Sequence, residues 1–494
     1  MILLSELLQR SGVQPDAVHG DASLGALVAD SRRSVPGALF VCMPSTSSDS
    51  HAFLAPARAA GASAALVHSA EGFDAAKALG LAVVRVDLPG FVEALWRIAR
   101  AFHEDPTRAL TVVGITGTNG KTTTACILRE ALEAMGRPTA YLGTLGITTP
   151  LHARALENTT PFSVELHALI LEAVGDGAEA LVMEVSSHAL DERRADGVAF
   201  DVGVFTNLSQ DHLDFHGSMD AYAAAKRRLF DALPKQTDKP FVAAFNVDDP
   251  VGAHWSREFA GRQVSYGLAA GALRGVARDV RVDGLTLDLE YGDDSATLNA
   301  RLGGHFNVSN CLSSAAALVA LGYGLDEACE ALGHAAPVPG RFEAVPNTLG
   351  IGVLVDYAHT PDALEKLLDS ARALQPRRLI TVFGCGGDRD RSKRPLMAKA
   401  ASERSDVVVL TSDNPRTEDP LSILEDVRAG VVPGVERYEI PDRPEAVAHA
   451  IALAYQGDIV VIAGKGHEDY QIIGRTKHPM DDRALARAGL EARR

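Results

Sequence analysis

The sequence predicts an α/β protein with three domains, and three observations predict it. Short apolar runs bounded by glycine, proline and polar residues alternate with alanine-rich helical stretches along the 494 residues. Several of these runs are apolar throughout, as expected of parallel strands buried on both faces. The proline-containing segments His103–Arg108 and Pro337–Gly340 have the composition of linkers. We therefore predict domains over residues 1–106, 107–337 and 338–494.

The composition limits the class of function. Hydrophobic residues make up 46% of the chain, so it is globular, and the net charge of −16 argues against non-specific binding of nucleic acid or anionic membranes. The five cysteines form no Cys-x-x-Cys pair and suit reduced thiols. Glu6 interrupts what would otherwise be a signal-peptide core, and no apolar run approaches the ~20 residues that span a bilayer. We expect a soluble, cytoplasmic protein.

The first predicted domain is a small α/β unit. Its strands are expected at Ala38–Met43, Ala64–His68 and Ala82–Asp87, with helical stretches between them, and the N-terminus begins an amphipathic helix. Residues 30–33, Asp-Ser-Arg-Arg, form a polar loop just before the turn at Pro36-Gly37. From these residues alone, a solvated loop and a binding loop are equally consistent.

The central domain is organised around residues 111–123, where an apolar strand leads into a glycine-spaced turn and then a helix. Small residues let backbone N–H groups close on phosphate oxygens, and Lys121 can reach the outer phosphates. The match to the usual P-loop pattern is imperfect, because Gly114 sits one residue too early and Ile115 takes its place. The predicted nucleotide-binding residues are Gly117, Thr118, Asn119, Gly120, Lys121, Thr122 and Thr123.

Two further strands of the central domain end in polar clusters. Ala180–Val185 and Val202–Thr206 are nearly all apolar, and Glu184 and His212 lie at or after their ends. Open α/β sheets bind ligands at the carboxyl ends of strands, so these side chains should lie beside the phosphates. Both are metal-ligand types and a triphosphate needs Mg²⁺, so we predict a magnesium site. Taken singly, each residue also fits a buried ion pair or a hydrogen-bonded histidine.

Three other features of the central segment are less specific. By composition, Lys226 looks like a solvated lysine in an alanine-rich helix. Residues 279–303 alternate in a hairpin-like pattern and predict an appended β element. Asn307 opens the next helix, where it could cap the helix or contact the nucleotide base.

The third domain is predicted to be a doubly wound, Rossmann-like sheet whose loops converge on one edge. Its strands are expected at Ile351–Val355, Leu379–Phe383, Asp406–Leu410 and Asp458–Ile462. The loop from Gly384 is not a dinucleotide fingerprint, because an arginine stands where the third glycine should be.

The converging loops carry a charge set that suits a zwitterionic amino acid. Arg389, Arg391 and Arg416 could grip a carboxylate with their planar forks. Glu468 could pair with an ammonium group, and Asn414 adds an amide. A salt-bridged network of surface loops is an equally consistent reading of these residues.

Taken together, these stretches resemble the Mur ligase family, ATP-dependent amide-forming enzymes of peptidoglycan precursor synthesis. The resemblance spans nearly the whole chain and its motifs occur in family order. The matching stretches are Asp30–Arg32, Gly117–Thr123, Asn158–Pro161, Glu184–His188, Asp211–Asp214, Ala224–Lys226, Gly340–Glu343, Asp356–Asp362, Asp413–Arg416 and Gly464–Glu468.

The resemblance implies a UDP-binding first domain, a central P-loop ATPase with a mostly parallel sheet and an amino-acid-binding third domain. It implies that ATP converts a carboxylate to an acyl phosphate, which the incoming amine attacks. Within the family, the chain most resembles the members that add the third amino acid. Their reaction joins meso-diaminopimelate to the D-glutamyl residue of UDP-N-acetylmuramoyl-L-alanyl-D-glutamate. The family also implies a monomer.

The resemblance assigns roles residue by residue. Around ATP it adds Asn307, Arg341 and His359 to the P-loop. Around the UDP-sugar peptide it places Ser31, Asn158, Thr159, Thr160, Ser186, Glu192 and Arg194. Around diaminopimelate it places Arg389, Asp413, Asn414, Pro415, Arg416, Gly464 and Glu468. The metal ligands are Thr122, Glu184, His212 and a carbamylated Lys226, and the catalytic set is Lys121, Glu184, His212 and Lys226.

Two departures from the family pattern fall near the UDP-sugar site. Glu192 stands where the family usually has glutamine, which places a like charge beside an anionic substrate. Ser50 replaces a common glycine, and the preceding Thr46–Ser48 run is not the usual sequence.

Arg416 bears on the choice among alternatives. Diaminopimelate has a distal carboxylate that an arginine can bind bidentately, whereas L-lysine lacks it. An L-lysine-adding relative is therefore the nearest alternative. A folylpolyglutamate synthetase shares the acyl-phosphate chemistry but would leave the first domain and the Asp413–Arg416 motif unexplained. A nucleotide-gated binding protein or motor would leave the amino-acid-shaped charge set unexplained.

Overall fold

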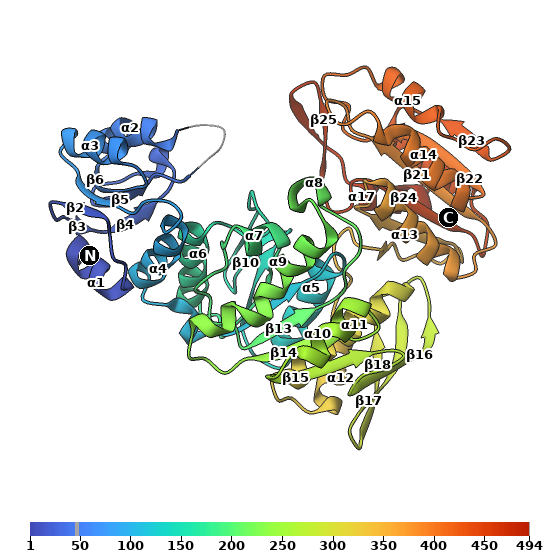
Figure 1. Cartoon of the computed structure of the whole chain (residues 1–494). Helices are drawn as coiled ribbons and strands as arrows, with labels where there is room; N and C mark the ends of the chain where they lie inside the picture. The colour runs from blue at the N-terminus through green and yellow to red at the C-terminus, as the bar shows by residue number, and fades with distance from the viewer. Residues whose placement is uncertain (45–48, 494) are drawn as a thin grey trace. The chain divides into compact units, whose positions relative to one another are not determined.

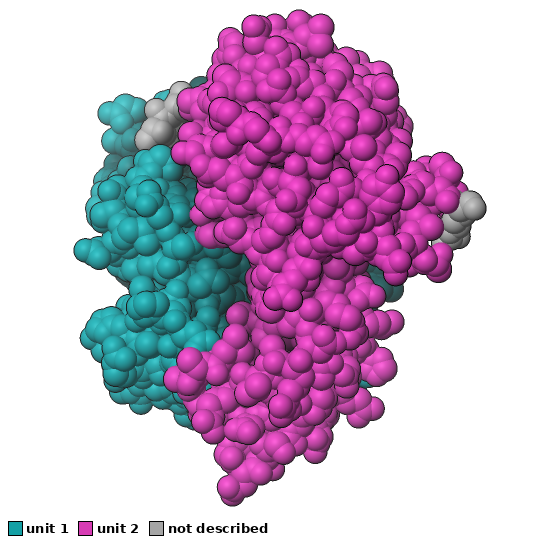
Figure 2. Space-filling model, turned by 90° about the vertical axis from the view of Figure 1, so that its right-hand side faces the viewer, with its two compact units in different colours: residues 1–266, 316–322 teal, residues 267–315, 323–494 magenta. Residues whose placement is uncertain are grey.

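The computed structural model describes residues 1–44 and 49–493, so the Thr46–Ser48 run lies outside the described residues. The chain divides into two compact units (Figure 2). One contains residues 1–266 and 316–322, and the other contains residues 267–315 and 323–494. No helix within the described ranges is long and apolar enough to cross a membrane. The domain limits at 106/107 and 337/338 stay predictions.

The first unit begins with a five-stranded sheet in the order β2-β7-β6-β5-β4 (Figure 1). Its strands are β2 (Ala17–His19), β4 (Ala26–Val28), β5 (Ala38–Val41), β6 (Ala62–Val67) and β7 (Ala82–Arg85). A separate antiparallel ribbon pairs β1 (Ile2–Leu3) with β3 (Ser23–Leu24). The helices are α1 (Leu4–Ser11), α2 (Leu54–Ala59), α3 (Ala70–Ala78) and α4 (Phe91–Phe102). Alternate residues of β5 enter two cores, Leu39 with α1 and α4, and Phe40 with α2 and α3. The predicted small α/β element is confirmed.

A larger, mostly parallel sheet follows in the same unit. Its parallel strands are β8 (Thr111–Thr116), β9 (Thr139–Gly143), β12 (Ala180–Glu184), β13 (Val202–Phe205), β14 (Val242–Asn246) and β15 (Arg262–Gly267). They lie in the order β9-β12-β8-β13-β14-β15, and β10 (Gly146–Thr148) and β11 (Ala153–Arg154) extend β9 antiparallel. Glu184 is in register with Ile115, and Phe205 with Thr116. The loops after these three strands therefore leave from one edge.

Helices connect the strands of this sheet. They are α5 (Lys121–Ala134), α6 (Ser163–Gly175), α7 (Ser187–Asp191), α8 (Leu213–His216), α9 (Met219–Asp231) and α10 (Pro250–Glu258). The segment predicted as a linker, His103–Arg108, is closely packed: Asp105 accepts hydrogen bonds from Arg100, Thr107 and Arg108.

The second unit opens with a three-stranded antiparallel element. Its strands are β16 (Leu273–Val280), β17 (Leu285–Tyr291) and β18 (Asp294–Ala300). The predicted β element at 279–303 is confirmed in kind, but it begins earlier, at Leu273. The alternation is obscured there because β16 exposes most of its side chains. Helices α11 (His305–Ala320) and α12 (Leu325–Gly333) follow.

The C-terminal sheet has the order β19-β20-β24-β21-β22-β23, parallel except for β19. Its strands are β19 (Glu343–Ala344), β20 (Gly352–Asp356), β21 (Leu379–Cys385), β22 (Val407–Ser412), β23 (Glu436–Glu439) and β24 (Ile459–Ala463). The helices are α13 (Pro361–Ala373), α14 (Lys393–Arg404), α15 (Pro420–Arg428), α16 (Arg443–Leu453) and α17 (Asp482–Glu491), and a hairpin of β25 (Tyr470–Ile473) and β26 (Thr476–Pro479) lies between β24 and α17.

Both faces of this sheet are covered, which confirms the doubly wound prediction. Helices α13 to α15 pack on one face with Phe383 and Val461, and α16 and α17 pack on the other with Val382 and Val460. Strands β21 and β22 each run two residues beyond their predicted ends. Asp413 therefore follows directly on its strand.

Candidate functional site

The loop between β8 and α5 has the geometry predicted for a phosphate cradle. Gly117 and Gly120 have φ of 151° and 84°, and a Cβ at Gly117 would lie 2.0 Å from the hydroxyl of Thr206. The ammonium of Lys121 donates to the carbonyls of Gly117 and Thr118, each at 2.9 Å. The strand–loop–helix geometry is present, while the binding roles of these residues stay predictions.

Glu184, at the end of β12, is fully buried beside this loop. Its carboxylate accepts from the Thr122 hydroxyl at 3.0 Å, the Tyr141 hydroxyl at 2.5 Å and the Thr144 backbone N–H at 2.9 Å. Burial and the negative charge of Glu184 raise the pKa of Tyr141 well above its usual value. Because Thr122 donates its proton to Glu184, the hydroxyl oxygen keeps its lone pairs for a cation.

Lys226 is 1% exposed, so the interpretation of it as a solvated lysine is wrong. Its ammonium donates to the carbonyl of Gly117 at 2.8 Å and lies 4.4 Å from the centre of the Tyr222 ring. Burial, and then the positive charge of Lys121, hold the pKa of Lys226 well below its usual value. A readable signal was present: Tyr222, Ala225, Lys226 and Leu229 have the i, i+3, i+4, i+7 spacing of a buried helix face.

His212 follows β13 at the same edge, with a left-handed backbone at φ 51°. Its exposed ring lies edge-on to His188, with centroids 4.8 Å apart, and its Nε2 is 3.5 Å from Asp211. Among the described residues, no hydrogen bond or ion pair joins His212 to Glu184 or Thr122. The structure brings those two together and places His212 on a neighbouring loop.

Several residues predicted for the UDP-sugar peptide converge on Thr160. Its hydroxyl donates to the carbonyl of Glu184 at 2.9 Å and accepts from the backbone N–H of Ser186 at 3.2 Å. Arg194 donates to the Thr160 carbonyl at 3.1 Å and pairs with Glu192 at 2.6 Å. The like charge that the sequence places at Glu192 is therefore balanced within the protein.

The remaining members of that set lie on other elements. The hydroxyls of Thr159 and Thr144 are 3.3 Å apart. Ser31 begins the 3-10 helix Ser31–Arg33 of the N-terminal sheet, where the Asp30 side chain accepts from the backbone N–H of Arg32. Asn158 lies in the loop before α6.

Three predicted nucleotide contacts belong to the second unit. Asn307 is buried, donating to the carbonyl of Gly303 at 2.7 Å and accepting from the amide of Asn310 at 2.9 Å. The guanidinium of Arg341 lies 5.1 Å from the centre of the Tyr357 ring, and the His359 ring is 4.6 Å from it. Their role at a nucleotide stays a prediction.

At the carboxyl edge of the C-terminal sheet, side chains from the β22 and β24 loops meet. Asn414 donates to Oε2 of Glu468 at 3.2 Å. Between them lies Lys465, fully buried, whose ammonium is 3.1 Å from Oδ1 of Asn414 and 2.8 Å from Oε2 of Glu468. Gly464, with φ of 116°, directly follows β24 and precedes Lys465.

Arg416 is held in a strained backbone conformation, with φ of 52°. Its backbone bridges to the β25–β26 hairpin, donating to the Ile472 carbonyl at 3.0 Å and accepting from Gly474 at 2.7 Å. Its guanidinium donates to the Gly387 carbonyl at 2.8 Å. A Cβ on Gly386 would lie 2.9 Å from that guanidinium and 3.6 Å from Cγ of Arg389. The two predicted arginines therefore flank one glycine loop, where Pro415 also packs.

Sequence reasoning gave no role to two buried cations of this edge. Lys465 follows an apolar strand and stands between two glycines, which was a signal of burial. Arg443, from α16, pairs with Asp482 at 2.7 Å and donates to the carbonyls of Ser412 and Ala463. It thus ties together the ends of β22 and β24. No local pattern reveals a pair that joins α16 to the start of α17.

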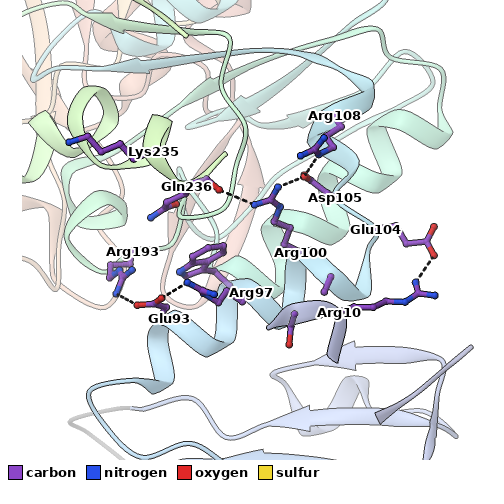
Figure 3. Close-up of a pocket in the computed structure, with 13 residues that line it drawn as sticks. Arg10, Glu93, Arg97, Arg100, Glu104, Asp105, Arg108, Arg193, Lys235 and Gln236 are labelled. Atoms are coloured by element: carbon purple, nitrogen blue, oxygen red, sulfur yellow. Dashed lines mark hydrogen bonds and ion pairs between the residues drawn. The ribbon is translucent and has the colours of Figure 1, made fainter. Parts of the chain in front are cut away.

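A cavity of about 710 Å³ lies elsewhere in the first unit, along α4 (Figure 3). Its lining includes six cationic side chains, but those of Arg10, Arg97, Arg100, Arg108 and Arg193 already form ion pairs. None of the predicted site residues is among the described residues that line it.

The geometry defines an α/β protein with a glycine loop between a strand and a helix of one sheet, and a cluster of charged side chains at the edge of a separate, doubly wound sheet. Comparison with known families agrees. The family model for the Mur ligase middle domain matches residues 115–318, and that for the Mur ligase, glutamate ligase domain matches residues 340–466.

The chain is 43% identical, over 479 residues and 96% of each sequence, to a UDP-N-acetylmuramoyl-L-alanyl-D-glutamate--2,6-diaminopimelate ligase of Geobacillus thermodenitrificans (strain NG80-2). A solved structure with the same enzyme name superposes with a TM-score of 0.70 at 32% identity, covering 99% of each chain. The fold also matches a MurF ligase of Thermotoga maritima in complex with ADP, with a TM-score of 0.61 at 18% identity over 95% and 98% of the two chains. The chain belongs to the Mur ligase family.

Proposed function

We propose that this ligase uses ATP to join meso-diaminopimelate to the D-glutamyl residue of UDP-N-acetylmuramoyl-L-alanyl-D-glutamate. The observation that carries the proposal is the charge set of the C-terminal sheet. Arg389 and Arg416 flank one loop, and Glu468 lies with Asn414 at the same sheet edge. Arginine forks suit the carboxylates of the substrate, and Glu468 suits an ammonium group.

A carboxylate becomes electrophilic only when one of its oxygens is made a good leaving group. In the proposed reaction the γ-phosphoryl group of ATP passes to an oxygen of the D-glutamyl side chain, and ADP leaves. The amine of diaminopimelate attacks the acyl carbon, the new C–N bond forms, and phosphate and a proton leave. The P-loop N–H groups and Lys121 hold the phosphates during transfer.

The residues beside the cradle fit Mg²⁺. Thr122 offers hydroxyl lone pairs, Glu184 a buried carboxylate and His212 an exposed imidazole. When bound, the ion would offset the negative charge that develops during phosphoryl transfer. Glu184 is pre-oriented by Tyr141 and Thr144, which donate hydrogen bonds to its carboxylate.

Lys226 is proposed to act as a carbamate. Its ammonium is held by a neutral carbonyl and a phenol ring, and its lowered pKa favours the amine form. The neutral Nζ can attack CO₂, forming a C–N bond and releasing a proton. The product carries a carboxylate-like group, so the side chain changes from a cation to an anion that could bind a metal ion.

The UDP-sugar peptide is proposed to bind at the Thr160 cluster, with Ser186 and Arg194, and at Ser31 of the N-terminal sheet. The Arg194–Glu192 pair supports this, because it holds the guanidinium in a fixed orientation at 2.6 Å. We further propose that the protein acts as a monomer in the cytoplasm, with domains over 1–106, 107–337 and 338–494.

The test is phosphate release from ATP and Mg²⁺ with UDP-N-acetylmuramoyl-L-alanyl-D-glutamate, adding meso-diaminopimelate or L-lysine in parallel. We expect release that requires the UDP-dipeptide and diaminopimelate and barely responds to lysine. Arg416→Met should raise the KM for diaminopimelate about ten- to hundredfold, because a hydrogen-bonded charge is lost. Arg487→Met, at an exposed position of α17, is the matched control and should leave KM unchanged.

Equal activity with lysine would overturn the amino-acid assignment and leave the ligase chemistry standing. Release that depends on neither amino acid would reject the proposed reaction and return attention to the folate-type or motor alternatives.

A further inference from the structure

Resting on the proposed function, we propose that Lys465 is a positioning residue for the incoming amino acid. Its buried ammonium engages Oε2 of Glu468 and Oδ1 of Asn414, which leaves Oε1 of Glu468 to receive the ammonium group of the substrate. Lys465 would thus set the orientation of two side chains that contact diaminopimelate, while Lys465 itself does not touch the substrate.

Lys465 is buried within the loop that follows β24. Its side chain is fully enclosed, whereas Glu468 is 19% exposed. Gly464 and Gly466 flank it with φ of 116° and 52°, so the backbone turns sharply on both sides. A cation in this position cannot be exchanged for a solvent ion or for the ammonium of a substrate. Lys465 is therefore a fixed member of this side-chain cluster.

The two oxygens of the Glu468 carboxylate have different surroundings. Oε2 accepts from Lys465 at 2.8 Å and from Asn414 at 3.2 Å. Among the described residues, no hydrogen bond to Oε1 is found. Since a carboxylate has two oxygens and about four acceptor positions, engaging one oxygen fixes the rotamer and leaves the other available.

Hydrogen bonds also fix the orientation of the Asn414 side chain. Its Oδ1 accepts from Lys465 at 3.1 Å and from the backbone N–H of Ile472 at 2.9 Å, while its amide nitrogen donates to Glu468. Two donors on one side and an acceptor on the other select a single amide orientation. Lys465 therefore orients Asn414 as well as Glu468.

Lys465 also affects its neighbours through its charge. Oδ1 of the Asp413 carboxylate lies 3.6 Å from Nζ of Lys465, so the carboxylates of Asp413 and Glu468 both lie beside this buried ammonium. The pKa of Asp413 is raised, chiefly by burial. The positive charges of Arg443 and Lys465 lower this pKa, whereas the negative charge of Glu468 raises it. Removing Lys465 would leave Asp413 with less neutralising charge, so its carboxyl group would bind a proton more readily.

The experiment is a double-mutant cycle on the full-length enzyme with Lys465→Met, Glu468→Gln and the combined variant. We expect Lys465→Met to raise the KM for diaminopimelate about ten- to hundredfold, with the KM values for ATP and the UDP-dipeptide unchanged. The acid limb of kcat/KM for diaminopimelate should move to higher pH. Because Lys465 acts through Glu468 as well as Asn414, the loss in the combined variant should be smaller than the sum of the two single losses.

Lys399→Met, at an exposed lysine of α14, is the matched control and should change none of these values. If Lys465→Met does not fold, the combined variant removes the unpaired carboxylate and is compared with Glu468→Gln alone. An unchanged KM in Lys465→Met, or fully additive effects in the cycle, would overturn the inference. Failure of the wild-type enzyme to use diaminopimelate would instead reject the proposed function, so the two failures are distinguishable.

Discussion

The carboxyl edge of the central sheet and that of the C-terminal sheet each hold a lysine that is almost fully buried. The two ammonium groups have different neighbours. Lys226 donates to the carbonyl of Gly117 and faces the ring of Tyr222, with the positive charge of Lys121 nearby. Lys465 contacts the Glu468 carboxylate and the Asn414 amide, with Asp413 close by.

The difference separates two uses of a buried lysine. Without a directly contacting carboxylate, burial favours the neutral amine, which can react. With carboxylates in contact, the ammonium is a fixed cation that holds other groups in place. Loss of the first should therefore cost activity, and loss of cations of the second kind should cost stability or positioning.

The largest effect is expected at Arg443, the other buried cation of the C-terminal edge. Arg443→Met should lower the free energy of unfolding by about 3–5 kcal/mol, because Asp482 remains buried and uncompensated. Denaturant unfolding would measure it. Arg443→Met combined with Asp482→Leu should recover most of the loss. A single variant as stable as wild type would contradict the assignment of this pair to stability.

At the central edge, Lys226→Ala should lower ligase activity by about 100- to 1000-fold, since a charge-stabilising group is lost from the transition state. A short carboxylic acid added to Lys226→Ala should restore part of the activity, because it can occupy the vacated space with two oxygens. Phosphate-release assays would measure both. The exposed lysine of α3, in Lys77→Ala, is the control. Full activity in Lys226→Ala would remove the functional half of the comparison.

The smallest effect is the pH dependence of stability. Between the lowered pKa of folded Lys226 and the unfolded value of about 10.4, the unfolded chain binds more protons, so unfolding free energy rises with pH. In CO₂-free buffer, the difference between wild type and Lys226→Met should rise by at most about 1.4 kcal/mol per pH unit and level off above that value. A difference that is flat or falls with pH would contradict the lowered pKa.

Much of the architecture could be predicted because strands and cradles leave local signals. The apolar runs from Ala180 and Asp458 were recognisable, and the glycines of residues 117–120 marked the loop. The hydrogen-bonding partners of Glu184 were not predictable, because Tyr141 and Thr144 come from β9 and the loop after it, about 40 residues earlier in the chain.

By itself, the sequence determined the α/β class, the order of strands and loops along the chain, and the motifs that join it to its family. These follow from patterns spanning a few residues, which local sterics and periodicity decide. Only the tertiary structure decided which buried lysine meets carboxylates and which does not. That outcome depends on side chains brought together by sheet register and helix packing, and burial amplifies the charge of whichever neighbours they meet.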